Sequence, residues 1–249
     1  MQVWSNPQAI KDYQDLLGGN APEEKVDGPS VIVGVGKLGT ALVELGGGDD
    51  ILVRRGETIP ETISVDRGGL GSREDGDGDR VELSEFPIYV CVKEDDVADV
   101  IDSCPVDKRQ DLVFLQGGCL EPLLKTRSVC RPEQTQATLC VGIKSVGAKI
   151  QDYQRNIGTD VRGDPKFSGQ TTVCGKWRGA LAGRLAKGGL PCSQVFYLDW
   201  RRVMFEKLCF DCAIDLVGAV HGFEKTGYIR KYFEGELCDL LFELKNALR

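Results

Sequence analysis

A glycine-rich turn near the start of the chain has the residue types and spacing of a phosphate-binding site. It reads G-x-G-x-x-G and directly follows the short apolar run 30–33. In such a turn the first glycine permits the tight bend, the second lets the backbone approach a pyrophosphate, and the third lets helix and strand pack closely. The alternative is an ordinary turn in a chain with 31 glycines; we favour dinucleotide binding because a predicted strand precedes the turn and a predicted helix follows it. The residues predicted to hold the cofactor here are Gly34, Val35, Gly36, Lys37, Leu38 and Gly39.

Two arginines after the next apolar run bear on the kind of dinucleotide. Arg54 and Arg55 follow residues 50–53, at a place where an NAD site usually offers a carboxylate to the ribose 2′-hydroxyl. A guanidinium instead suits the 2′-phosphate of NADP, because it can bind phosphate through two hydrogen bonds. Glu57 is close enough to keep NAD as the less favoured cofactor, and the alternative is that both arginines are solvated surface residues. The sequence therefore favours NADP.

A lysine and two aspartates in the second half of the chain have helical spacing. Lys207, Asp211 and Asp215 stand at i, i+4 and i+8 and share one helix face. A lysine that faces a substrate cleft can donate a proton to a carbonyl being reduced, and its charge stabilises the developing alkoxide. The alternative is an ion pair on a helix surface. We predict Lys207 as a general acid, with the two aspartates either tuning it or binding hydroxyl or ammonium groups.

Ten cysteines and one histidine restrict the remaining chemistry. Zinc sites usually need two close Cys/His pairs, and only Cys209 and Cys212 form one, so no metal is predicted. Most cysteines are expected to be buried reduced thiols, which indicates the cytoplasm or another reducing compartment. Thiol redox chemistry at Cys209 and Cys212 is a weaker alternative. His221 precedes a glycine at the end of a helical pattern, so we expect a helix-terminal residue favoured by the helix dipole.

Short apolar runs alternate with helical patterns through much of the chain. Strands are predicted at 30–33, 50–53, 88–92 and 112–115, with closing strands near 136–150. Strands that alternate with helices predict an α/β fold with a doubly wound parallel Rossmann sheet, followed here by a smaller, mainly helical C-terminal domain.

Three parts are predicted along the chain: an N-terminal helical extension (1–29), a dinucleotide-binding domain (30–168) and the mainly helical domain (169–249). An acidic run at 74–79 lacks the glycine and glutamate positions of a calcium loop, so we expect a solvated loop. In the last part we predict a helix over 171–187, a strand over 194–198, a long helix capped by Asp199 and an amphipathic helix over 233–248.

The composition excludes several classes of protein. With 31 Lys+Arg and 38 Asp+Glu, the net charge of the 249 residues is −7, which argues against non-specific nucleic-acid binding because that binding neutralises phosphates. No apolar run approaches the roughly 18–20 residues of a membrane helix, and the first residues lack the pattern of a secretory signal. We therefore expect a small-molecule substrate, with no nucleic acid and no membrane as partner.

Taken in order, these motifs resemble ketopantoate reductase and its relatives in the 6-phosphogluconate dehydrogenase-like superfamily. The resemblance covers residues 30–249. It rests on the glycine turn, on Arg54, and on three further motifs: Val92-Lys93, the run 116–118 and the run 205–208. It implies NADPH-dependent reduction of a 2-keto acid. It also implies roles for three residues, with Arg54 at the 2′-phosphate, Lys93 near the junction of cofactor and substrate, and Lys207 as the general acid.

The chain departs from this family where the substrate would bind. The family usually has Asn at the positions of Asp211 and Asp215, and Asn-Gly where this chain has Gly117-Gly118. An ionised aspartate only accepts hydrogen bonds and repels an anion. The sequence also ends near the middle of the family's helical domain, so ketopantoate itself is not the expected substrate.

A non-catalytic nucleotide-binding or assembly module is therefore the alternative function. An apolar stripe on the last helix favours a homodimer under either function. Its members include Leu237, Leu241 and Leu244.

Overall fold

A computed structural model describes residues 25–66, 80–152, 171–222 and 225–247 of the chain. The helix predicted within residues 1–29 and the acidic run 74–79 lie outside these described residues.

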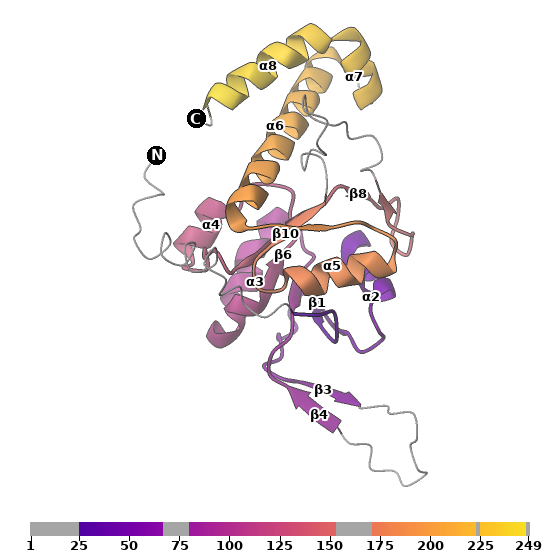
Figure 1. Cartoon of the computed structure of the whole chain (residues 1–249), viewed down its shortest axis with the longest axis vertical. Coiled ribbons are helices and arrows are strands. Elements are labelled where there is room, and N and C mark those ends of the chain that lie inside the picture. Colours follow the sequence, from indigo (N-terminus) through magenta and orange to yellow (C-terminus); the bar gives the residue numbers. More distant parts are fainter. Residues whose placement is uncertain (1–24, 67–79, 153–170, 223–224, 248–249) are drawn as a thin grey trace.

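A seven-stranded sheet forms the centre of the molecule, in the order β11-β10-β7-β6-β5-β1-β2 (Figure 1). Neighbours from β2 to β7 pair in parallel, whereas β10 runs antiparallel to β7 and β11 runs parallel to β10. Five strands therefore end at one edge of the sheet, which we call the carboxyl edge, and the predicted doubly wound, mostly parallel sheet is confirmed. The strands are β1 (Val31–Val33), β2 (Ile51–Val53), β5 (Ile88–Val90), β6 (Leu112–Phe114), β7 (Thr135–Thr138), β10 (Thr172–Cys174) and β11 (Ser193–Gln194).

Two smaller strand pairs lie outside this sheet. The hairpin of β3 (Ile63–Asp66) and β4 (Arg80–Leu83) projects away from the sheet (Figure 1). The pair β8 (Val141–Gly142) and β9 (Gln151–Asp152) follows β7. The hairpin was not among the strands that the sequence predicted.

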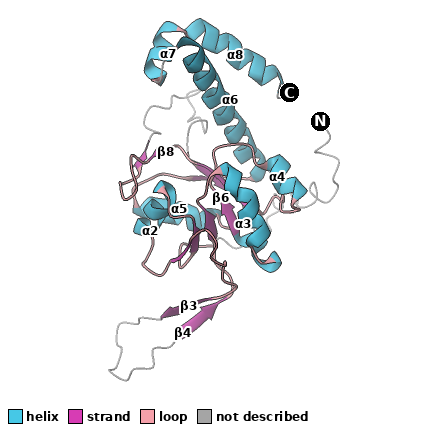
Figure 2. Ribbon diagram, turned by 180° about the vertical axis from the view of Figure 1, so that it is seen from behind, coloured by secondary structure: helices cyan, strands magenta, loops and turns pink. Residues whose placement is uncertain are grey.

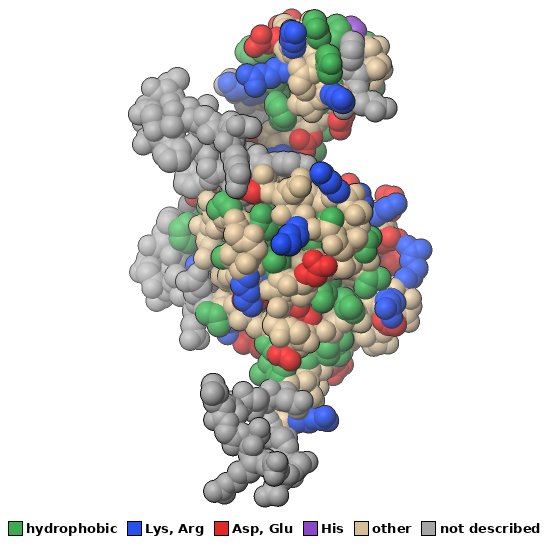
Figure 3. Space-filling view, turned by 90° about the vertical axis from the view of Figure 1, so that its right-hand side faces the viewer, with side chains coloured by type: hydrophobic (Ala, Val, Ile, Leu, Met, Phe, Trp, Pro, Cys, Tyr) green, Lys and Arg blue, Asp and Glu red, His purple; other side chains and the backbone are tan. Residues whose placement is uncertain are grey.

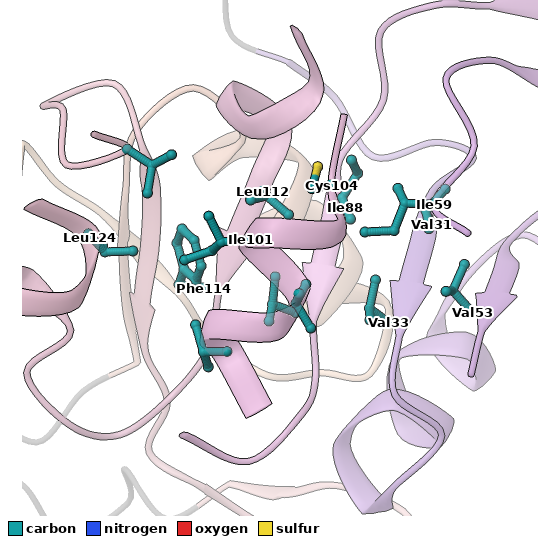
Figure 4. Packing of buried hydrophobic residues seen from close by; sticks show 14 of the residues in the cluster. Val31, Val33, Val53, Ile59, Ile88, Ile101, Cys104, Leu112, Phe114 and Leu124 are labelled. Atoms are coloured by element: carbon teal, nitrogen blue, oxygen red, sulfur yellow. The ribbon is translucent and has the colours of Figure 1, made fainter. Parts of the chain in front are cut away.

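Helices cover both faces of the sheet because successive strand residues point to opposite sides. On one face Val31, Val33 and Phe114 pack with α3 (Val97–Ser103) and α4 (Glu121–Thr126) (Figure 4). On the other face, the intervening residues such as Ile32, Tyr89 and Val113 pack with α2 (Lys37–Leu45) and α5 (Arg178–Lys187). Short 3-10 turns precede α3 and β6, at η2 (Glu94–Asp96) and η3 (Val106–Asp111).

A buried arginine fixes α5 to the opposite, amino edge of the sheet. The Arg184 side chain has no exposed surface and donates hydrogen bonds of 2.9–3.0 Å to the Asp50 carboxylate, which lies just before β2. It also donates to Asp27 at 2.9 Å and to the Ser30 hydroxyl at 3.0 Å. Because these partners precede β1 and β2, the hydrogen bonds of the Arg184 guanidinium hold the starts of two neighbouring strands together.

The C-terminal part is helical and rises from the sheet (Figures 1 and 2). It consists of α6 (Tyr197–His221), α7 (Thr226–Tyr232) and α8 (Glu234–Ala247). The first half of α6 packs near β10 through Trp200 and Met204, and the far end packs with α7 and α8 around Ile214 and Leu237. The predicted helical C-terminal region is therefore confirmed. In Figure 3 these helices form a lobe above the body of the molecule.

Three predicted elements in this region were wrong. Residues 172–174 form a strand rather than helix, because β-branched residues there complete the buried sheet beside β7, and α5 begins only at Arg178. The strand predicted at 194–198 is limited to β11, since α6 already begins at Tyr197. Phe196, not Asp199, occupies the N-cap of α6, and Asp199 lies in its first turn. Residues 172–194 thus pack as part of the sheet domain.

Candidate functional site

The three glycines of the turn after β1 occupy three different environments. Gly34 has φ +100°, and a Cβ there would lie 2.9 Å from the carbonyl oxygen of Cys91 after β5. A Cβ on buried Gly39 would lie 1.9 Å from the Gly34 carbonyl oxygen. At Gly36, by contrast, no described atom lies within 4 Å of the Cβ position. The first and third glycines thus allow neighbouring backbone segments to pack closely. The second leaves the backbone accessible to a ligand, as binding of a pyrophosphate requires.

The N-terminus of α2 is open to an anion at this turn. Gly36 is the N-cap residue, and within the described residues neither a side-chain cap nor an acidic residue occupies the first turn. The first amides of a helix have no intrahelical partner, and the helix dipole makes this end positive. The exposed side chain of Lys37 adds a positive charge. The free amides at the start of α2 and the positive charge at this end of the helix therefore both suit a phosphate group.

The segment after β2 distinguishes two adjacent arginines. The Arg55 guanidinium pairs with the Asp96 carboxylate after β5, at 2.6 Å. The Arg54 side chain is exposed, and no ion pair involves it in the part of the chain that the structure describes. Glu57 accepts a hydrogen bond from the Arg54 backbone amide at 2.6 Å, so its carboxylate closes the turn. Both guanidiniums are exposed, and within the described residues that of Arg54 is the one without an ion-pair partner.

The ends of β5 and β6 are fastened by a glutamine. The Gln116 side-chain amide donates to the carbonyl oxygens of Val90 and Val92 at 2.9 and 3.0 Å, and its oxygen accepts from the Leu115 amide at 3.1 Å. Lys93 is exposed at the N-cap of η2, directly after this connection. Gln116 thus holds in place the two loops that border the turn on the carboxyl edge.

Lys207 lies on α6 near the end of β7. Its ammonium pairs with the Asp211 carboxylate one turn later, and the lysine side chain is 23% exposed. The pKa of the Cys140 thiol lies above its usual value because the thiol is buried. The positive charge of Lys207 acts against this increase, because the lysine lies near the thiol. Because Cys140 follows β7, Lys207 belongs to the same sheet edge as the glycine turn, with β6 and β5 between β7 and β1. Asp215 is exposed further along α6.

A carboxylate at the start of α4 anchors α6 to the sheet domain. Glu121 accepts hydrogen bonds from the Tyr197 hydroxyl at 2.8 Å and from the Arg201 guanidinium. Its side chain is only 6% exposed. Although burial raises the pKa of Glu121, these hydrogen bonds hold it below its usual value. No sequence signal marks this contact, because its partners lie 76 and 80 residues from Glu121.

The histidine and the cysteines contribute to packing and helix ends. His221 ends α6, where its Nε2 lies 2.7 Å from the Glu236 carboxylate and its ring stacks on Phe233, as expected of a helix-terminal residue. All ten cysteines are free thiols: Cys104 and Cys174 are buried, six are partly buried, and Cys212 and Cys238 are exposed. The expected burial of most cysteines is therefore complete at two positions and partial at six. Burial raises the pKa of Cys209 and so suppresses its thiolate form.

No group of three or more potential metal ligands occurs in residues 25–66, 80–152, 171–222 and 225–247. Across the same ranges, none of the helices is both long enough and apolar enough to span a bilayer.

Comparison with known proteins gives similarities of structure. No protein-family model matches the chain, and no curated protein matches its sequence. A 2-dehydropantoate 2-reductase from Porphyromonas gingivalis is similar at a TM-score of 0.47 and 12% identity, covering 88% of this chain and 80% of that one. A protein described as a probable 2-dehydropantoate 2-reductase from Bacillus subtilis is similar at 0.48 and 17%, with 87% and 74% covered. D-mandelate dehydrogenase in complex with NADH is similar at 0.40 and 11%, with 88% and 80% covered.

Because all three TM-scores lie below 0.5, the activity has to be argued from the residues at the carboxyl edge.

Proposed function

We propose that this protein is an NADP-dependent oxidoreductase that reduces a small carbonyl compound of the 2-keto acid type. The observation that carries the proposal is the open Gly36 position at the uncapped start of α2, between two closely packed glycines. The backbone at Gly34, Val35, Gly36, Lys37, Leu38 and Gly39 would hold the pyrophosphate. The free Arg54 guanidinium supports NADP over NAD, since the carboxylate of Glu57 is engaged by the backbone. Arg55, held by Asp96, is the second candidate for the 2′-phosphate.

Lys207 is the proposed general acid. When bound, NADPH supplies a hydride to the carbonyl carbon. The Lys207 ammonium donates a proton to the carbonyl oxygen, and Asp211 holds the lysine side chain in place through their ion pair. Lys93 is proposed near the junction of cofactor and substrate. Because Asp211 and Asp215 are acidic, a substrate with a hydroxyl or ammonium group suits this edge better than ketopantoate.

Binding and turnover can be tested separately. In a fluorescence titration, NADPH should bind more tightly than NADH, and the absence of binding at millimolar cofactor would reject the proposed site. With a panel of keto acids, Lys207→Ala should abolish NADPH oxidation, whereas Lys245→Ala, an exposed lysine on α8, should not. Full activity of Lys207→Ala would remove Lys207 from the mechanism.

The second candidate is a non-catalytic nucleotide-binding or assembly module. It is favoured by the Lys207–Asp211 pair, which also fits a plain helix-surface ion pair. NADPH binding without any Lys207-dependent turnover on the panel would support it.

The stripe of Leu237, Leu241 and Leu244 that favoured a homodimer packs within the lobe against Ile214 and Val217, so it needs no second copy to cover it. A homodimer through the C-terminal helices remains part of either proposal on other side chains. Apolar side chains on this lobe are exposed, including Val220 at 73% and Phe242 at 64%, and Figure 3 shows hydrophobic and charged side chains side by side on it. Sedimentation should show a dimer that Phe242→Asp weakens. The ten free thiols support a reducing compartment such as the cytoplasm.

A further inference from the structure

A hollow lies at the amino edge of the sheet, the edge opposite the glycine turn. It has a volume of about 800 Å³ and is bordered by residues 106–110 before β6, residues 127–134 before β7, and Lys176 after β10. Because β10 runs antiparallel to β7, its end meets the start of β7 at this edge. The hollow is thus separated from the carboxyl edge by the length of the strands. Its volume falls within the range of small-molecule sites, about 300–1,000 Å³.

Basic side chains outnumber acidic ones in the lining of this hollow. Four basic side chains contribute to it, against the two carboxylates of Asp107 and Glu133. Two of the basic groups are already paired with carboxylates outside the lining: Arg127 with Asp102 at 3.0 Å, and Lys176 with both Asp111 and Glu85 at 2.7 Å.

The other two basic groups are Arg109 and Arg131. The Arg109 side chain donates through Nε to the Cys104 carbonyl oxygen at 3.3 Å. In the described ranges neither arginine forms an ion pair, although Arg109 is half-buried. A half-buried guanidinium without a counter-charge has lost part of its hydration, so an anion that reaches it gains a strong, charge-assisted hydrogen bond. Arg109 comes from the turn before β6 and Arg131 from the loop before β7, so they approach the hollow from two separate segments.

Backbone strain occurs in the same lining. Ser128 has φ +56°, the one positive φ of a non-glycine residue in the described ranges. It follows α4, where its amide donates to the Lys125 carbonyl oxygen at 3.1 Å, a position usually taken by glycine. A left-handed serine costs about 1–2 kcal/mol, and such strain tends to occur at binding sites. Serine keeps in this lining a hydroxyl that glycine would lack.

We propose that this hollow binds a small organic molecule with a phosphate group, held by the guanidiniums of Arg109 and Arg131 and by the Ser128 hydroxyl. A phosphate group is favoured over a carboxylate because it presents three acceptor oxygens, enough for two guanidiniums from separate segments and a hydroxyl.

The test uses inorganic pyrophosphate as the probe, in calorimetry at constant ionic strength. The full chain carries Gly36→Asp throughout, which weakens phosphate binding at the glycine turn. A further loss caused by the arginine variants is then assigned to the hollow and not to the proposed function. In this background pyrophosphate should bind, and Arg109→Gln with Arg131→Gln should weaken it at least tenfold. Arg230→Gln, an exposed arginine of α7, is the matched control and should not change the affinity. Ser128→Ala should weaken binding about threefold.

Thermal unfolding checks that each variant is folded. No pyrophosphate binding in the Gly36→Asp background, or equal binding by the double arginine variant, overturns the proposal. Succinate binding as tightly as pyrophosphate overturns the assignment to phosphate.

Discussion

Two glycines of one turn should respond in opposite ways to substitution. Gly36 faces open space at the N-cap of α2, whereas a Cβ on Gly39 would lie 1.9 Å from the Gly34 carbonyl oxygen. We therefore compare Gly36→Asp, its neutral counterpart Gly36→Asn, and Gly39→Ala. If the turn binds a pyrophosphate, the first variant should lose binding without losing stability, and the last should lose stability itself.

The magnitudes follow from these environments. Aspartate at an N-cap is better than glycine by a few tenths of a kcal/mol, and its charge at the positive end of α2 adds about 0.3–1 kcal/mol. Gly36→Asp should thus raise the unfolding temperature by about 1–4 °C for a chain of this size. The same carboxylate about 4 Å from a phosphate repels it by about 1–4 kcal/mol, which is roughly five- to several-hundred-fold in affinity. Gly39→Ala forces the Gly34 carbonyl to move and should cost about 1–3 kcal/mol.

Calorimetric unfolding and NADPH fluorescence titration measure the two effects on the same samples. Gly36→Asn has a side chain of the same size without the charge, so its smaller loss of affinity gives the contribution of crowding. Wild-type NADPH affinity in Gly36→Asp would refute the placement of the phosphates at this turn. Wild-type stability in Gly39→Ala would refute the close approach of helix and strand.

Three further predictions concern named side chains. Arg184→Met should lower the free energy of unfolding by about 3–5 kcal/mol in a urea titration, because it leaves the buried Asp50 carboxylate without its partner; a loss below 1 kcal/mol would contradict this. The depressed pKa of Glu121 means that its stabilising contribution is fully present above its ordinary value of 4.5 and is lost as the pH falls through the lower folded-state value. Acid titration of Glu121→Gln should therefore show a flatter loss of stability below about pH 4.5 than the wild type, and equal slopes would exclude this role. Arg54→Gln should reduce the preference for NADPH over NADH about tenfold, as expected for a lost phosphate–guanidinium contact of about 1.5 kcal/mol or more, whereas Arg55→Gln should change it little; the reverse order would assign the 2′-phosphate to Arg55.

Local patterns in the sequence determined the fold class and the place of the glycine turn. Strand and helix periodicity, and the glycines at 34, 36 and 39, depend on neighbours within a few residues, so they can be identified without the tertiary structure. The helix predicted over 233–248 agrees with α8 at Glu234–Ala247 for the same reason. The prediction failed at 172–174, where a strand forms because β7 lies beside it.

Only the tertiary structure decided which side chains are available for chemistry. Residue type and spacing do not separate Arg54 from Arg55, and only the family resemblance favoured Arg54. In the structure Asp96, 41 residues later, pairs with Arg55. The Glu121–Arg201 contact that anchors the Lys207 helix spans 80 residues, and three separate segments form the hollow at the amino edge. Such pairings depend on which strands become neighbours in the sheet. That arrangement is a property of the whole packed chain, so no local pattern encodes it.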